Sequence, residues 1–502
     1  MNSTNDWFHK VLNLSFKALF FPPLIGSFVY LCYLFFKNDN NLVLSIFCFL
    51  ISILLIGITY YALKNNYNNS LIITIIFTVA FLIRFLWFYK IDGVPISDFH
   101  QMFADAENFL HGDTHMFKNY SYFARFPHMS ITVLYFSLII KVFPNPLIAI
   151  KNIYIIFSML NIIFIFFISK EIFQNKKKSI WVLLISSIYT PMISYNNVYC
   201  SENIAMPLLL LSILMFFKAL NRDMKNKFFF FSMSGLSLSI MHLFRPLGYI
   251  MIIAYIMYIF IYFKEKFKLK VFKSLLVIVM FVIPYVIVSY TLISLNITEN
   301  PLWHPMEPIS VSVLKGTNIE SGGAWNQEDY DLVNKYDHNY DLVNKAAKET
   351  IKQRLTTTPT IKLLCFYSFK YGRQWSIGDF GGIYWAQLGF NEAYNLDTTG
   401  KKKDSILINF NDDLQIYTQI FHITILILSY VGLYNNKKFK NYKIDFFYIM
   451  FYGLSLQCLL IESQDRYTYP FSWIFIILAI TAFNKNNMSS NLNGNGGENG
   501  RS

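Results

Sequence analysis

The chain has 502 residues, of which 54% are hydrophobic, 19% aromatic and only 15% charged. Because soluble proteins carry about 25% charged residues, this composition excludes an ordinary soluble globular protein. The formal net charge of +13 does not indicate a nucleic-acid partner, since the basic residues are spread over short loops between apolar runs. The unbroken apolar runs also exclude a transmembrane β-barrel, whose strands alternate in polarity.

Hydropathy predicts about twelve membrane-spanning helices, because an α-helix needs about 20 apolar residues to cross a bilayer. The chain is therefore expected to be an all-α polytopic membrane protein. The expected spans are 16–36, 42–63, 70–89, 148–169, 179–195, 204–220, 228–244, 247–263, 274–295, 413–433, 445–461 and 468–484.

Lysine-rich loops set the expected orientation. Placing the amino terminus in the cytoplasm puts "KEIFQNKKK" (170–178), "KALNRDMKNK" (218–227), "KEKFKLKVFK" (264–273) and "NNKKFKNYK" (435–443) inside, as the positive-inside rule requires. The apolar run 129–143 would invert this order if it crossed the membrane. At about fifteen residues it is short for a span, so we expect a juxtamembrane helix on the outer surface. Both termini are then cytoplasmic, and no cleavable signal peptide is expected.

These elements predict five segments. Residues 1–69 hold two leading transmembrane helices, and residues 70–295 form a transmembrane core with a first external loop at 90–147. An external segment with an interfacial helix follows at 296–412, then C-terminal transmembrane helices at 413–484. The Gly/Asn-rich tail at 485–502 is expected to be disordered. The sequence "YDLVNK" occurs at 330–335 and 340–345, either as a local helix duplication or as a binding repeat.

The first external loop opens with "SDFHQMFADAENFLHGD" at 97–113. Ser97 or Asp98 could cap the helix that follows. Alternatively, Asp98 is a general base at the membrane surface, where partial desolvation raises the pKa of a carboxylate. Asp105 and Glu107 are interpreted as a solvated helix face.

Further charged residues flank the outer ends of the expected spans. Glu202 either supports the first helical turn after Ser201 or contacts a substrate. Arg245 and Arg466 are either interface anchors or partners of a phosphate, which arginine binds bidentately.

Arg125 and His128 add two candidates near the expected surface helix. The histidines are scattered and the five cysteines share no metal-binding spacing, so a zinc site is not expected. No phosphate-binding loop of the ATPase type is present in the sequence.

Several motifs, in this order, resemble landmarks of the GT-C glycosyltransferases. They are a span ending in Arg84, "SDFHQMFADAENFLHG", "YFARFPHMS", "VYCSENIAMPLLLL", "LFRPLGYI", "GTNIESGGAWNQED" and "ESQDRYTYPFSW". The likeness is greatest to the protein O-mannosyltransferase and lipid A aminoarabinose transferase branch, and it extends from about residue 70 to 484.

The resemblance implies an inverting glycosyltransferase that uses a polyprenyl-phosphate sugar on the outer face of a cell membrane. Asp98 matches the catalytic aspartate of such families. The implied substrate-binding residues are Glu202, Arg125, His128, Arg245, Glu462, Arg466 and Tyr467.

Many relatives carry an acidic pair where this chain has Asp98 followed by Phe99. A divalent metal is therefore not predicted, and no other cofactor is expected. The implied acceptor is a cell-envelope polymer, a glycolipid or a protein, and heavy use of Asn, Lys, Ile and Phe suggests a bacterial source. The alternatives are a lipid-linked glycan flippase or transporter, or a polysaccharide polymerase or ligase.

Overall fold

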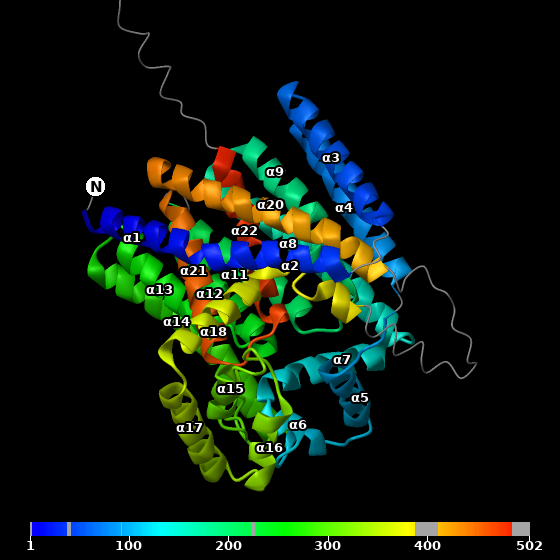
Figure 1. Ribbon diagram of the computed structural model, residues 1–502, viewed down its shortest axis with the longest axis vertical. Helices are drawn as coiled ribbons and strands as arrows, with labels where there is room; N and C mark the ends of the chain where they lie inside the picture. The colour runs from blue at the N-terminus through cyan, green and yellow to red at the C-terminus, as the bar shows by residue number, and fades with distance from the viewer. Residues whose placement is uncertain (1–2, 38–41, 92, 222–225, 387–409, 484–502) are drawn as a thin grey trace, which may run out of the picture.

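The computed structural model describes residues 3–37, 42–91, 93–221, 226–386 and 410–483. All regular elements within these ranges are helices (Figure 1), which confirms the predicted all-α class. The tail at 485–502, for which disorder was expected, lies outside the described residues.

Within the described ranges, nine helices are long and apolar enough to cross a membrane, or up to eleven if two bent helix pairs each form one span. A polytopic membrane protein is thus confirmed, with fewer continuous spans than expected. The spans are α1 (Ser3–Leu19) continued by α2 (Phe21–Lys37), α3 (Val43–Lys64), α4 (Asn69–Lys90), α8 (Pro146–Phe173), α11 (Glu202–Leu220), α12 (Lys227–Phe244), α14 (Phe267–Ser294), α20 (Phe410–Phe439) and α21 (Tyr442–Leu460).

Three expected spans are short or broken. The run 179–195 is divided into α9 (Lys176–Ile188), α10 (Pro191–Ser194) and η3 (Tyr195–Asn197), while α13 (Gly248–Tyr262) has only 15 residues. The last run becomes η4 (Asp465–Phe471), α22 (Ile474–Ile480) and η5 (Thr481–Phe483), with a bend of 53°. Pro191 begins α10 and Pro470 lies within η4. Proline lacks an N–H and cannot continue the hydrogen bonds of an α-helix.

The described part of the loop expected at 90–147 forms its own helical layer. It contains α5 (Asp98–Leu110), η1 (His115–Phe117), α6 (Tyr122–Arg125), η2 (Pro127–Met129) and α7 (Ser130–Val142). The segments on either side of Phe126 are bent by 114°, and the Ser137 hydroxyl of α7 donates to the Ala106 carbonyl of α5 at 3.1 Å. The short α7 thus packs on α5; its position on the membrane surface stays a prediction.

The polar face expected on α5 is only partly solvated. Asp105 is 7% exposed and accepts hydrogen bonds from Gln101 at 2.5 Å and Asn108 at 3.2 Å, so its expected exposure was wrong. Glu107 is exposed, as expected. Asp105 lies next to Ala106, which contacts Ser137 of α7.

A second group of helices follows α14: α15 (Ile309–Gly316), α16 (Gln327–Lys335), α17 (Tyr340–Thr357) and α18 (Thr360–Ser376). In Figure 1, α15 and α16 lie at the same end of the molecule as α5 and α6. Val311, Val333 and Val343 form a small separate core. Val333 and Val343 occupy the same position of the repeated "YDLVNK" and both pack in this core, which favours the local duplication.

The long helices have one end rich in lysine. There, Lys177 donates to the Leu63 carbonyl at 2.9 Å, Lys443 donates to the Glu171 carbonyl at 2.5 Å, and Lys440 pairs with Asp6 at 2.9 Å. We call this the basic end. The opposite end, called the site end, is where α4, α12 and α21 finish and α11 begins.

The leading helices are integral to the bundle. Phe16 of α1 packs on Phe451 of α21, with ring centroids 4.9 Å apart. Near the basic end, Asp445 of α21 accepts hydrogen bonds from His9 at 2.8 Å and Tyr262 at 2.5 Å, and both His9 and Asp445 are at most 1% exposed. A buried polar cluster therefore joins α1, α13 and α21.

Replacing one member of this cluster should cost more stability than replacing both. His9→Leu leaves the Asp445 carboxylate buried without its imidazole partner, so we expect a loss of about 3 kcal/mol. The double variant His9→Leu/Asp445→Leu should recover part of that loss. Thermal unfolding of the purified protein in detergent measures the difference, and additive losses would contradict the coupling.

Candidate active site

The segment before Asp98 is held at the site end by side chains from η3 and the residues after it. Asn197 donates to the Ile91 carbonyl at 2.8 Å, and Tyr199 donates to the Gly93 carbonyl at 3.2 Å. Ser97 has a φ of 50° and its side chain makes no capping hydrogen bond. A positive φ is uncommon for a residue other than glycine and is often found at functional sites.

Asp98 makes long-range contacts in place of the cap that was considered. Its carboxylate accepts a hydrogen bond from the Tyr122 hydroxyl at 2.8 Å and pairs with the Arg466 guanidinium of η4 at 3.0 Å. The Asp98 side chain is 31% exposed, whereas that of Arg466 is 6% exposed. The guanidinium carbon of Arg466 lies 5.1 Å from the ring centroids of both Phe99 and Trp385. Asp98 is thus oriented by buried groups and still open to solvent.

A second ion pair lies at the same end. Glu202, the first residue of α11, contacts Arg245 at 2.7 Å, and the two side chains are 1% and 13% exposed. Ser201 makes no capping hydrogen bond to the helix. The Tyr467 ring lies 5.4 Å from the Arg245 guanidinium and 5.8 Å from that of Arg466. It therefore connects the two ion pairs.

His128 belongs to the same group of side chains. Burial and the positive charge of Arg245 lower the pKa of His128 to about 3, with further effects from His242, Asp98 and Arg466. Its imidazole is therefore neutral at physiological pH. One nitrogen of a neutral imidazole donates a hydrogen bond and the other accepts one, so His128 can bind polar groups without adding a charge to the site.

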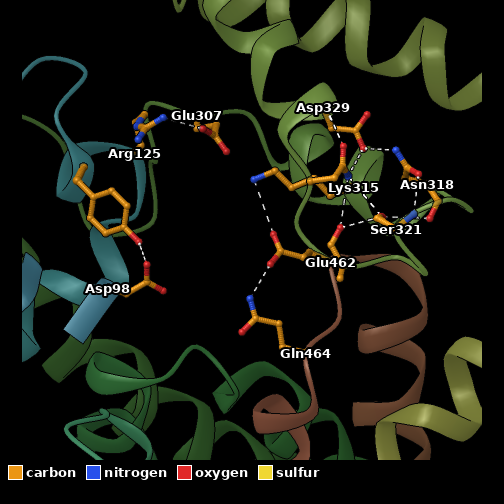
Figure 2. A network of polar contacts seen from close by, with 12 residues as sticks. Asp98, Arg125, Glu307, Lys315, Asn318, Ser321, Asp329, Glu462 and Gln464 are labelled. Carbon is orange, nitrogen blue, oxygen red and sulfur yellow. Dashed lines mark hydrogen bonds and ion pairs between the residues drawn. The ribbon is translucent and has the colours of Figure 1, made fainter. Parts of the chain in front are cut away.

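Arg125 and Glu462 lie in a neighbouring network, which Figure 2 shows beside Asp98. Arg125 pairs with Glu307 at 3.4 Å, while Glu462 contacts Lys315 at 3.7 Å and accepts a hydrogen bond from Gln464 at 3.0 Å. Burial raises the pKa of Glu307, against the opposing effects of Lys315 and Arg125. The structure thus brings six of the eight proposed site residues together and places the other two in this neighbouring network.

Lys370 of α18 holds the segment that carries Glu462 and Arg466. Its ammonium group donates to the carbonyls of Gly316 at 2.8 Å, Leu459 at 2.8 Å and Ile461 at 2.7 Å. Burial lowers the pKa of Lys370 to about 8, so the group is still largely charged at neutral pH. Lys370 therefore fixes the chain after α21 against α15.

Six residues that belong to the site, or that hold its residues in place, were not predicted from the sequence. Tyr122 stands in the quoted "YFARFPHMS", where its distance from Arg125 could have suggested a shared role. The others carry no local signal, because their contacts depend on tertiary packing. They are Trp385, Glu307, Lys315, Gln464 and Lys370.

The described part of the chain contains no group of three or more His, Cys, Asp or Glu side chains placed to hold a metal ion. What the site end offers is a carboxylate open to solvent beside two guanidinium groups. Such a set can accept a proton at Asp98 and bind an anionic group at Arg245 and Arg466.

Residues 131–289 match the family model of the dolichyl-phosphate-mannose-protein mannosyltransferases. This match confirms the resemblance predicted from the sequence. The matched region includes Glu202 and Arg245, whereas Asp98 and Arg466 lie outside it. No curated protein matches the sequence.

Among solved structures, the chain is similar to an oligosaccharyltransferase of Archaeoglobus fulgidus in its apo form. The identity is 12% and the TM-score 0.46, over 84% of this chain and 51% of that one. The same organism's enzyme AglB, in complex with an inhibitory peptide and a dolichol-phosphate, gives 13% identity and a TM-score of 0.47, over 83% and 50%. The chain thus spans about half the length of these structures.

Loss of the Lys370 ammonium should loosen the segment after α21. Lys370→Met leaves three buried carbonyls without their donor, and we expect a loss of about 3 kcal/mol in unfolding free energy. Trypsin should also cleave faster after Arg466. Lys362→Met, at an exposed position of the same helix, is the matched control and should stay within about 0.5 kcal/mol. Equal behaviour of the two variants would refute the positioning role of Lys370.

Proposed function

We propose that this chain, a multi-pass membrane protein, is a glycosyltransferase of the GT-C superfamily and moves a sugar from a polyprenyl-phosphate donor to a hydroxyl of a cell-envelope acceptor. The acceptor is a polymer, a glycolipid or a protein. The observation that carries the proposal is the pairing of Asp98 with Arg466 at 3.0 Å, close to the Glu202–Arg245 pair.

The two arginines fit the phosphate of a lipid-linked donor. Arg245 and Arg466 flank one aromatic ring at the ends of apolar helices, where a lipid head group would lie. The Nε of Arg466 is buried and has no hydrogen-bond partner among the described residues. Buried donors without partners are costly, and a phosphate oxygen is an acceptor that would satisfy them.

Asp98 supplies the base. The acceptor oxygen attacks the anomeric carbon of the sugar as its bond to the phosphate breaks, with inversion of configuration, and the acceptor proton passes to the Asp98 carboxylate. The departing polyprenyl phosphate keeps the electron pair, and its charge is stabilised by Arg245 and Arg466. His128, Glu202 and Tyr467 orient the sugar and the phosphate. Arg125 and Glu462, in the neighbouring network with Glu307 and Lys315, contact the acceptor.

The two unlike ends of the bundle support an orientation. Lysines gather at the basic end, which we place in the cytoplasm together with both termini. The site end then faces the exterior of the cell membrane, where a water-borne acceptor and a lipid-linked donor meet. The extra helices α5–α7 and α15–α17 lie on this side.

Removal of the Asp98 charge should abolish transfer without unfolding the protein. Asp98→Asn still accepts a hydrogen bond from Tyr122 but cannot take a proton, so kcat should fall by about 1,000-fold or more. The assay follows labelled hexose from polyprenyl-phosphate hexoses onto isolated envelope material with purified protein. Glu107→Gln, on the exposed side of the same helix, is the control and should keep full activity.

Undiminished transfer by Asp98→Asn would remove the catalytic assignment. Movement of intact donor across vesicles without any transfer would favour a flippase, and transfer of whole glycan chains would favour a polymerase or ligase.

Arg466→Lys should weaken donor use selectively. Lysine keeps the charge but loses the planar fork that binds phosphate bidentately, so we expect KM for the donor to rise about tenfold and kcat to fall. KM for the acceptor should change little. Arg373→Lys is the matched control, because Arg373 is half-exposed and pairs with the adjacent Asp465 at 3.5 Å. An unchanged donor KM in Arg466→Lys would exclude this arginine from phosphate binding.

A further inference from the structure

A cavity of about 230 Å³ opens at the basic end, far from Asp98. It lies where α11 ends at Leu220, α12 begins at Lys227, α13 ends and α21 begins. Lys227, Lys264 and Lys443 contribute to its wall. The start of α12, the loop after α13 and the start of α21 thus bring three ammonium groups around one space, at the level where apolar spans finish.

The cavity carries an excess of positive charge. Its one carboxylate, Glu265, pairs with the buried Lys273 of α14. Among the residues that the structure describes, neither Lys227 nor Lys264 forms an ion pair. The Lys443 ammonium group donates to the carbonyl of Glu171 and also interacts electrostatically with the Glu171 carboxylate. Lysines gathered in this way repel one another until an anion lies among them.

The surroundings favour a lipid over a soluble anion. Phe228 and Phe229, directly after Lys227, are 51% and 56% exposed, and Phe267, two residues after Glu265, is 70% exposed. These rings lie on spanning helices, so acyl chains can cover them. Tyr258 and Tyr262 line the same cavity, and tyrosines are enriched at the depth of lipid head groups.

We propose that this cavity binds the phosphodiester head group of an anionic phospholipid, with the acyl chains along the exposed phenylalanines. The lipid belongs to the leaflet at the basic end, which is the inner leaflet if the orientation proposed above holds. Binding itself requires neither that orientation nor the transfer reaction. The bound lipid would tie α11, α12, α13 and α21 together at the end opposite the active site.

The test uses the full-length chain, delipidated in a neutral detergent and titrated with short-chain phosphatidylglycerol. Native mass spectrometry counts the bound lipid, and the shift in unfolding temperature gives its affinity. We expect saturable binding of phosphatidylglycerol and none of phosphatidylcholine. Because a lysine near an anionic lipid contributes about fivefold in affinity, the triple variant Lys227→Gln/Lys264→Gln/Lys443→Gln should bind on the order of a hundredfold more weakly.

The matched control is Lys176→Gln/Lys266→Gln/Lys268→Gln, which removes the same charge from exposed positions at the same end. Its affinity for phosphatidylglycerol should fall by less than about twofold. The single variant Lys264→Gln, at an exposed side chain, should bind phosphatidylglycerol about fivefold more weakly. This variant tests the proposal if the triple variant does not fold. Equal losses in both triple variants, or equal binding of phosphatidylcholine, would overturn the proposal. Displacement of the lipid by millimolar inorganic phosphate would also overturn it, in favour of a free anion.

Discussion

The hydrocarbon of a bilayer excludes unpaired charge, and the rest of this structure follows from that constraint. Spans of about 20 apolar residues leave charged side chains only at their two ends, so residues distant in the sequence meet there. Asp98 and Arg466 are 368 positions apart and share a contact of 3.0 Å. The basic end gathers lysines by the same rule. Its cavity and the candidate active site are two results of this separation of charge.

The two ion pairs of the site contribute to the stability of the folded protein, because each holds a buried charge next to its opposite. Glu202 is 1% exposed, and a carboxylate so buried must be paired, which Arg245 provides. Arg466 is held between Asp98 and aromatic rings, at 5.1 Å from Phe99. In the proposed function, a donor phosphate at these arginines would compete with their existing carboxylate partners. Asp98 would then be released toward the acceptor, so the proposed base would become available when the donor is in place.

Much of this arrangement could be predicted from the sequence, because hydropathy and lysine bias are local patterns. The class, most spans and the convergence of Asp98, Glu202, Arg245 and Arg466 at one end follow from counting helices. Breaks within apolar runs were missed, since hydropathy does not register the hydrogen bond lost at Pro191 or Pro470. Asp105 was placed in solvent because no pattern within α5 shows that its side chain is buried. Lys370 was missed for a related reason: its three acceptors come from two other elements.

The partners of the buried cations differ between the scaffold and the candidate site. Lys370 directs its ammonium group at three carbonyls within 2.8 Å, so it has little left to offer a ligand. Arg84, fully buried in α4, donates from its Nε and Nη1 to Ser158 and to the carbonyls of Ala80 and Ser187, while its Nη2 has no partner among the described residues. Arg466 pairs with the partly exposed carboxylate of Asp98 and, among the described residues, leaves its Nε without a partner. In the proposed function, a donor phosphate would supply an acceptor for this Nε.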